Sequence, residues 1–107
     1  MKFSVIIPCH NGARYISKAL QSVQDQTHPA HEIIVVDDAS TDGSIEVVQN
    51  SGIPTRLFDV NCRCAGGARN EGIKQAIGDW VAFLDADDFW YPHHLEEAAR
   101  VLSESSD

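Results

Sequence analysis

A run of apolar residues that ends abruptly in acids constrains this sequence more than any other feature. Residues 80–84 (Trp-Val-Ala-Phe-Leu) lead directly into Asp85, Asp87 and Asp88. An apolar run of this length is typical of a strand buried on both faces in a parallel sheet. A charged side chain does not enter a core unpaired, so Asp85 is expected where the strand reaches water or a cation. Three crowded carboxylates repel one another, and a divalent cation between them would relieve that repulsion.

Earlier segments repeat this pattern. Residues 3–8 and 32–36 are predicted to be buried strands, and a weaker strand is expected at about 55–59. Helical spacing of apolar residues predicts helices between the strands and after Pro92. In the third of these helices, which begins at a glycine pair, the residues expected to face the sheet are Ile73, Ala76 and Ile77.

This alternation of strands and helices predicts an α/β fold with a parallel sheet and helices on both faces. Right-handed crossovers and buried central strands favour the strand order 3-2-1-4, which is half of a Rossmann-like sheet. Residues 1–107 contain no repeat, linker or low-complexity segment, so we expect them to form a single domain.

Composition excludes several classes of function. The formal net charge is −8 and no basic cluster is present, which argues against a nucleic-acid partner. No apolar run is long enough to span a bilayer and no signal peptide is visible, so a cytoplasmic location is predicted, with peripheral membrane contact left open. The three cysteines lack the spacing of a zinc site and are interpreted as reduced, small apolar residues.

In an open parallel sheet, ligands bind at the carboxyl ends of the strands, where the strand order reverses. In the predicted sheet this place lies between the first and the fourth strand. Three segments should meet there, namely residues 8–12, 37–38 and 85–88, with the helix start at 66–70 close by. Their acids suit a metal ion or ligand hydroxyls, and Arg69 suits a phosphate.

Each of these elements also has a structural explanation. Asp37 and Asp38 could cap the next helix, because acids are favoured at helix N-termini. Gly66-Gly67 could be an ordinary turn, and Arg69 could be a solvated surface residue. The sequence has no GxGxxG motif after the first strand, no GxSxG elbow and no P-loop, which argues against dinucleotide enzymes, serine hydrolases and P-loop NTPases.

Taken together, four segments resemble the nucleotide-sugar-binding half of a glycosyltransferase family 2 enzyme with the GT-A fold. These segments are residues 5–11 (VIIPCHN), 32–44 (EIIVVDDASTDGS), 66–72 (GGARNEG) and 83–92 (FLDADDFWYP). They occur in the family's order and cover nearly the whole chain. The resemblance therefore rests on the combination of motifs.

The resemblance implies a role for particular residues. Those assigned to the nucleotide sugar are Pro8, Cys9, His10, Asn11, Asp37, Asp38, Gly67, Arg69, Asp85, Ala86 and Asp87. One of Asp37 and Asp38 would accept a base N–H, and Arg69 would approach the diphosphate. Asp85-Ala86-Asp87 would be the family's DxD motif, with Asp85 near the ribose or metal and Asp87 on a Mg²⁺ or Mn²⁺ ion. Asp88 would be a supporting or sugar-facing acid.

The implied activity is transfer of a sugar from a nucleoside diphosphate sugar, with UDP as the expected nucleotide, to a carbohydrate or lipid-linked acceptor hydroxyl. The reaction is expected to be inverting and metal-dependent. No residue of the chain is assigned as the catalytic base, which the family carries further along. The chain is therefore interpreted as an N-terminal, donor-binding portion of a longer enzyme, poorly able to turn over alone. Self-association through the fourth strand or the last helix is also expected, because a truncated sheet exposes edges.

Two other interpretations remain open from the sequence. One is a non-catalytic module that binds a nucleotide, a metal or another protein. The other is a phosphotransfer enzyme of the haloacid dehalogenase type, in which Asp85 would be the nucleophile and Asp87 the acid/base. Such enzymes place this motif on the first strand, whereas here it follows the fourth.

Overall fold

A computed structural model of the chain describes residues 1–61, 63 and 65–105. Its elements are β1 (Phe3–Cys9), α1 (Ile16–Gln24), β2 (Glu32–Asp38), α2 (Ser44–Gln49), β3 (Arg56–Val60), α3 (Ala65–Gln75), β4 (Trp80–Phe83) and α4 (His94–Ser105). In this part of the chain four parallel strands pair in the order β3-β2-β1-β4. The predicted α/β alternation and the strand order 3-2-1-4 are confirmed.

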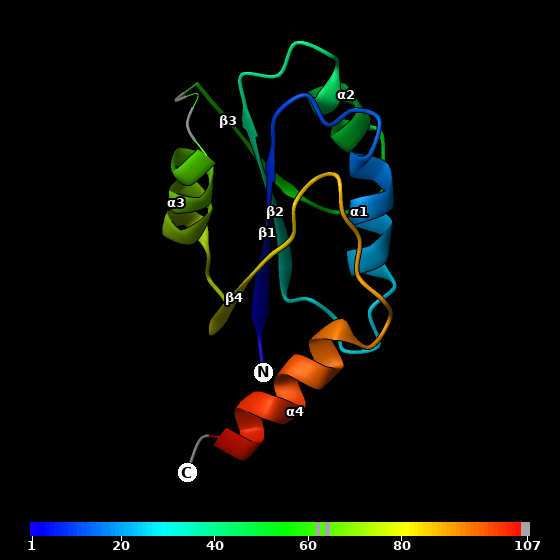
Figure 1. Cartoon of the computed structure of the whole chain (residues 1–107), viewed down its shortest axis with the longest axis vertical. Coiled ribbons are helices and arrows are strands. Elements are labelled where there is room, and N and C mark those ends of the chain that lie inside the picture. Colours follow the sequence, from blue (N-terminus) through cyan, green and yellow to red (C-terminus); the bar gives the residue numbers. More distant parts are fainter. Residues whose placement is uncertain (62, 64, 106–107) are drawn as a thin grey trace.

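Helices cover both faces of the sheet, as predicted. Figure 1 shows α1 and α2 on one side of the strands and α3 on the other. The central strand β1 serves both layers because successive strand side chains point to opposite faces. Val5 and Ile7 of β1 pack with α1, whereas Ile6 packs with Ala68 of α3.

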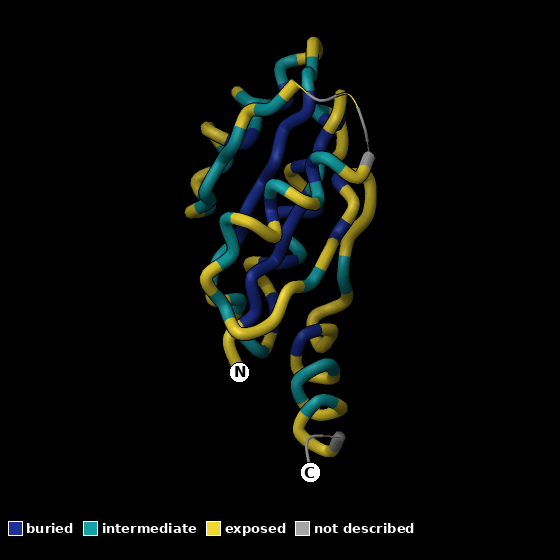
Figure 2. The backbone as a smooth tube through the Cα atoms, turned by 90° about the vertical axis from the view of Figure 1, so that its left-hand side faces the viewer, coloured by how far each residue is buried: buried dark blue, intermediate teal, exposed yellow. Residues whose placement is uncertain are grey.

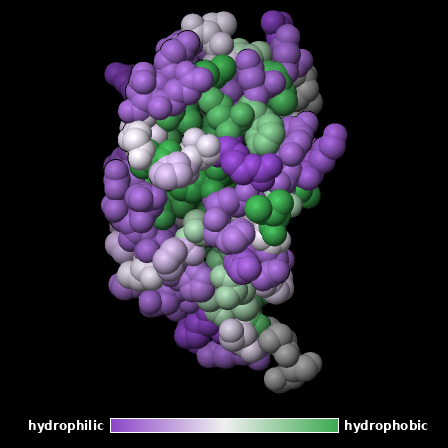
Figure 3. All heavy atoms as spheres, turned by 180° about the vertical axis from the view of Figure 1, so that it is seen from behind, coloured by the Kyte–Doolittle hydropathy of each residue, from purple (hydrophilic) through white to green (hydrophobic). Residues whose placement is uncertain are grey.

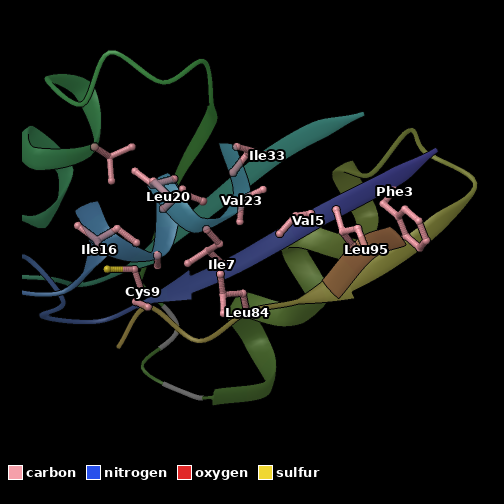
Figure 4. Packing of buried hydrophobic residues seen from close by; sticks show 14 residues of the cluster. Phe3, Val5, Ile7, Cys9, Ile16, Leu20, Val23, Ile33, Leu84 and Leu95 are labelled. Atoms are coloured by element: carbon pink, nitrogen blue, oxygen red, sulfur yellow. The ribbon is translucent and has the colours of Figure 1, made fainter. Parts of the chain in front are cut away.

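The larger core lies between β1 and α1 (Figure 4). The α1 residues Ile16, Leu20 and Val23 follow one another at helical spacing and are fully or almost fully buried. Leu84 and Leu95, from either side of the acidic segment, join the same core. Each such side chain contributes about 1.5–3 kcal/mol when it is fully buried. The core therefore holds both ends of the segment that carries Asp85 and Asp87.

Helix α3 packs on the sheet through a different set of residues from the one predicted. Ile73 and Ile77 are 49% and 68% exposed, so the prediction that they face the sheet is wrong. Ala68 and Gly72 are buried instead, and Ala76 is half-buried. A Cβ atom added to Gly72 would lie 2.4 Å from the Cγ2 atom of Ile6. The helix approaches the sheet so closely that only small residues fit between them, and Ile73 is turned outward. The helix ends at Gln75, earlier than predicted, so Ile77 lies beyond it.

Strand β4 was predicted to be buried on both faces, and this is also wrong. Trp80 and Phe83 are each 42% exposed, and Val81 is exposed as well. Among the described residues β4 pairs only with β1, so it forms one edge of the sheet. The opposite edge, β3, is half-buried and lies on the back of the molecule, where Figure 3 shows hydrophobic atoms at the surface between hydrophilic ones.

The two ends of the sheet differ in character. At the end where β2 begins, Glu32 accepts hydrogen bonds from the Ser4 hydroxyl, the Ile77 N–H and Arg56. Burial raises the pKa of Glu32, but these bonds outweigh it and hold the pKa below its usual value. Helix α4 extends past this end and is mostly exposed (Figure 2). None of the described helices is both long and apolar enough to cross a membrane.

The close packing of α3 predicts opposite effects for two glycine substitutions. Gly72→Ala is expected to lower the free energy of unfolding by about 1–3 kcal/mol, because the new methyl group overlaps Ile6. Gly66→Ala, where an added Cβ meets no atom within 4 Å, is the matched control and should be neutral or stabilising by up to about 1 kcal/mol. Urea unfolding measures both. Equal effects of the two substitutions would contradict this packing.

Candidate functional site

A cleft of about 830 Å³ lies at the carboxyl ends of β1 and β2 and beside the segment that follows β4. Its lining residues are Pro8, Cys9, His10, Asn11, Gly12, Tyr15, Asp38, Ala39, Thr41, Arg63, Ala68, Arg69, Asp85, Ala86 and Asp87. Its volume is in the range of small-molecule and cofactor sites. It also lies at the position where open α/β sheets bind ligands.

The structure brings most of the predicted site residues to this one cleft. All of them line it except Asp37 and Gly67. The cleft is also lined by residues that were not predicted as site residues, namely Tyr15, Ala39, Thr41, Arg63 and Ala68. Of these, Arg63 could have been singled out as a basic residue in the loop before the predicted helix. The roles of all these side chains remain predictions.

The two loops that form the base of the cleft are held together by hydrogen bonds. Three consecutive backbone N–H groups of the β1–α1 loop donate to side chains of the β2–α2 loop. The bonds run from Asn11 to Ser40 Oγ (2.8 Å), from Gly12 to Ser44 Oγ (3.0 Å) and from Ala13 to Asp42 Oδ2 (3.1 Å). In return, the Thr41 N–H donates to Asn11 Oδ1 (2.8 Å). These bonds fix the two loops relative to each other before any ligand binds.

The acids of the β2–α2 segment have different positions. Asp37 is buried, and both of its carboxylate oxygens accept bonds from Ser40, one from the hydroxyl and one from the N–H. Asp42 accepts bonds from Ser44 and Ala13; the Ser44 hydroxyl contributes most to a pKa below the usual range. Asp38 lines the cleft, although only 6% of the residue is exposed. The sequence left open which of Asp37 and Asp38 would contact a nucleobase. Of the two, Asp38 is the one that lines the cleft.

His10 faces the cleft with a defined proton position. Its Nδ1 atom lies 2.5 Å from the carbonyl oxygen of Asp38, and because a carbonyl only accepts, Nδ1 carries the proton. The Asn11 side-chain nitrogen lies 3.4 Å from the other ring nitrogen, Nε2. Nearby Cys9 is buried and free, and burial raises the pKa of its thiol, so it remains protonated at neutral pH. Cys62 and Cys64, also interpreted as reduced, lie outside the described residues.

The acids after β4 are divided between the cleft and the turn. Arg69 donates to Asp85 Oδ1 at 3.2 Å, and Asp87 lines the cleft beside them. Asp88 does not line the cleft; its Oδ1 accepts the N–H of Phe89. The three acids do not therefore form a single cluster, and no group of three or more possible metal ligands occurs among the described residues. Two carboxylates nevertheless fit Mg²⁺ or Mn²⁺, which commonly take one or two carboxylates and complete their shell with substrate phosphates and water.

Unusual backbone conformations are concentrated at the cleft. In the described part of the chain, the non-glycine residues with positive φ are Asn11 (52°), Ala39 (57°) and Arg63 (52°). All of them line the cleft. Such conformations cost free energy and persist where the surrounding structure imposes them, often at binding sites.

The chain is similar in sequence and in fold to known proteins. The model of the family described as glycosyl transferase family 2 matches residues 4–107. "Uncharacterized glycosyltransferase alr2836" of Nostoc sp. (strain PCC 7120) is 46% identical over 98% of this chain and 34% of its own length. The S. aureus TarS 1-349 structure in complex with UDP-GlcNAc has a TM-score of 0.86 at 37% identity, and the match covers 97% of this chain and 32% of that one.

A second solved structure extends the comparison. The mannosyltransferase PcManGT from Pyrobaculum calidifontis, in complex with GDP-Man and Mn²⁺, has a TM-score of 0.84 at 28% identity. That match covers 99% of this chain and 32% of the other. The chain thus spans about a third of the length of these similar proteins.

The contact between the loops predicts that Ser44 is important for stability. Ser44→Ala leaves the buried Gly12 N–H without its acceptor and should lower the free energy of unfolding by about 1–3 kcal/mol. Ser17→Ala, at an exposed position on α1, removes the same hydroxyl and should have little effect. Urea unfolding compares the two variants. A Ser44→Ala protein as stable as the Ser17→Ala protein would contradict the proposed importance of this bond.

Proposed function

The chain belongs to glycosyl transferase family 2, and on this basis we propose that its cleft binds the sugar donor, a nucleoside diphosphate sugar. The sugar would be transferred to the hydroxyl of a carbohydrate or lipid-linked acceptor, with inversion. The observation that carries the proposal is the convergence on one cleft of three segments of the chain, which contribute Asp38, Arg69, and the pair Asp85 and Asp87.

Each of these side chains has a chemical role in the proposal. Asp38 accepts an N–H of the nucleobase at the β2 end of the cleft. Arg69 donates to the diphosphate, which competes with Asp85 for the guanidinium. Asp87 and Asp85 hold Mg²⁺ or Mn²⁺. When bound there, the metal ion neutralises the charge that develops on the departing diphosphate.

The choice of donor and metal draws support from the solved structures. TarS was crystallised with UDP-GlcNAc, which favours UDP as the nucleotide here at 37% identity. PcManGT was crystallised with GDP-Man and Mn²⁺, which favours a divalent metal ion. An acidic cleft needs cations to accept an anionic ligand, and the described lining has three acids, Asp38, Asp85 and Asp87, against two arginines, Arg63 and Arg69. A metal ion supplies the remaining positive charge.

We assign donor binding to residues 1–107 and the catalytic base to residues outside this sequence. In this proposal the acids in the described lining of the cleft already bind the nucleobase, the metal ion or Arg69. The similar proteins are about three times as long as this chain, which leaves ample sequence for acceptor binding. The alternative of a non-catalytic interaction module differs in one respect: it requires no metal-dependent nucleotide binding.

Calorimetric titration of the protein with UDP in the presence of Mn²⁺ tests the proposal. Wild-type protein should bind, and Asp87→Asn should weaken binding at least about tenfold, because metal-site residues act on this scale even when they are not direct ligands. Asp79→Asn removes the same charge from an exposed position before β4 and is the matched control. EDTA should weaken wild-type binding as Asp87→Asn does.

Two results would count against this assignment. Absence of UDP binding, or binding that is indifferent to both EDTA and Asp87→Asn, would contradict the donor and metal sites. Efficient sugar transfer by residues 1–107 alone would contradict the division between donor binding and catalysis.

We also propose that the 107-residue protein self-associates through β4. Trp80, Val81 and Phe83 are exposed on this edge strand, and Ile77 is exposed at the approach to it. An unpaired apolar edge strand favours pairing with another chain. The other segment considered from the sequence, α4, exposes Val101 but otherwise presents mainly charged and small residues.

Light scattering over a range of protein concentrations tests the contact. Wild-type protein should form dimers or larger species, and Val81→Lys should shift the population to monomer because a lysine on the edge opposes strand pairing. Val101→Lys, the same change at an exposed position on α4, should leave the association unchanged. A monomeric wild-type protein at every concentration would refute self-association.

A further inference from the structure

Arg63 lines the cleft, but no specific contact with the donor is yet assigned to its side chain. It follows β3, lines the cleft, and its backbone N–H donates to Asp38 Oδ1 at 2.9 Å. The backbone of Arg63 is thus fixed beside the carboxylate proposed to bind the nucleobase. The residue is exposed, so its side chain is accessible to a ligand that enters the cleft.

The backbone conformation of Arg63 is costly for this residue type. Its φ of 52° is one that glycine adopts freely and that asparagine tolerates through local hydrogen bonds. Asn11, which has the same φ, is of this residue type, and its side chain accepts the Thr41 N–H of the neighbouring loop. Arginine has neither advantage, so the surrounding structure imposes this conformation, as often happens at binding sites.

The strand order separates Arg63 from the other arginine of the cleft. Asp38 ends β2, whereas Asp85, the partner of Arg69, follows β4, and β1 lies between these two strands. Two strand spacings amount to about 10 Å. A nucleoside diphosphate is long enough to span this distance, with its base near Asp38 and Arg63 and its diphosphate near Arg69, Asp85 and Asp87.

We propose that Arg63 contacts the nucleobase of the donor and, with Asp38, selects it; this inference rests on the proposed donor site. Asp38 only accepts hydrogen bonds and the Arg63 guanidinium only donates them. Together they match a base edge on which a ring N–H lies next to a carbonyl oxygen. Uracil and guanine have this edge, whereas adenine and cytosine present an amino group and an unprotonated ring nitrogen in its place.

The variant Arg63→Gly isolates the side chain. Glycine keeps the N–H that bonds Asp38 and adopts a φ of 52° without strain, so the variant should unfold in urea at the same or a higher denaturant concentration than wild type. By calorimetry with Mn²⁺ present, its affinity for UDP should fall about tenfold to a hundredfold, the range expected for a lost hydrogen bond to a charged group. Its affinity for inorganic pyrophosphate, which has no base, should be unchanged.

Two further measurements serve as controls. Arg14→Ala removes the same charge from an exposed residue outside the cleft lining and should bind UDP as wild type does. Wild type should bind UDP at least about tenfold more tightly than ADP, and Arg63→Gly should reduce this preference. Arg63→Lys retains the charge without the planar guanidinium and should also weaken UDP binding, which provides a second test if Arg63→Gly does not fold.

The possible failures are distinct. Unchanged UDP affinity in Arg63→Gly, in a protein whose Asp38→Asn variant binds UDP weakly, would overturn the role of Arg63 and leave the donor site intact. Equal weakening of UDP and pyrophosphate binding would place Arg63 at the phosphates and would also overturn the inference. Failure of wild-type protein to bind UDP would overturn both the donor site and the role of Arg63.

Discussion

The structure depends on the central strand β1, which is paired on both edges and packed on both faces. Parallel ladders join it to β2 and β4, while Val5 and Ile7 meet one helical layer and Ile6 meets the other. Because interiors are closely packed, a strand held in this way has little freedom to move. The loop that follows it, residues 10–13, is anchored by this strand. Consecutive backbone N–H groups of this loop hydrogen-bond to side chains at the β2–α2 connection and hold that connection in place. The cleft is therefore preorganised by the sheet, and its ligand-binding groups need little ordering on binding.

The acids near the carboxyl ends of the strands fall into two groups: some orient the loops, and others line the cleft. Asp37 and Asp42 orient loops by accepting bonds from backbone and hydroxyl groups, and Asp88 caps a turn. Asp38, Asp85 and Asp87 line the cleft. The first group gives the second its geometry: Ser40, held by Asp37, accepts the Asn11 N–H, and Asn11 in turn holds the Thr41 N–H. A change in any of the loop-forming acids would therefore alter ligand binding without contact with the ligand.

The sequence predicted what depends on local periodicity and on general rules of α/β topology. Apolar runs defined the strands, crossover handedness gave their order, and the acids at strand ends indicated the position of the cleft. The predictions from the sequence were wrong where burial depends on how the elements are placed relative to one another in the folded chain. Ile73 and Ile77 have helical spacing suited to a core, but Gly72 brings α3 so close to Ile6 that Ile73 turns outward, and Ile77 lies beyond the end of the helix at Gln75. Trp80 and Phe83 were predicted to be buried but are exposed, because an apolar run does not show whether its strand is central or at an edge of the sheet.

Electrostatics explains why the cleft combines arginines with paired acids. A diphosphate repelled by Asp85 and Asp87 binds only if positive charge lies between them, and Arg69 is already engaged by Asp85. In the proposed site a metal ion would supply this positive charge, and donor binding would then depend on the metal ion as well as on arginine. Near Asp38 the need is different, because a nucleobase is neutral and offers donors and acceptors in a fixed pattern. There, in the proposed arrangement, the Asp38 carboxylate would accept a hydrogen bond and the Arg63 guanidinium would donate one. The two ends of the cleft would then use the same residue types for different physical purposes.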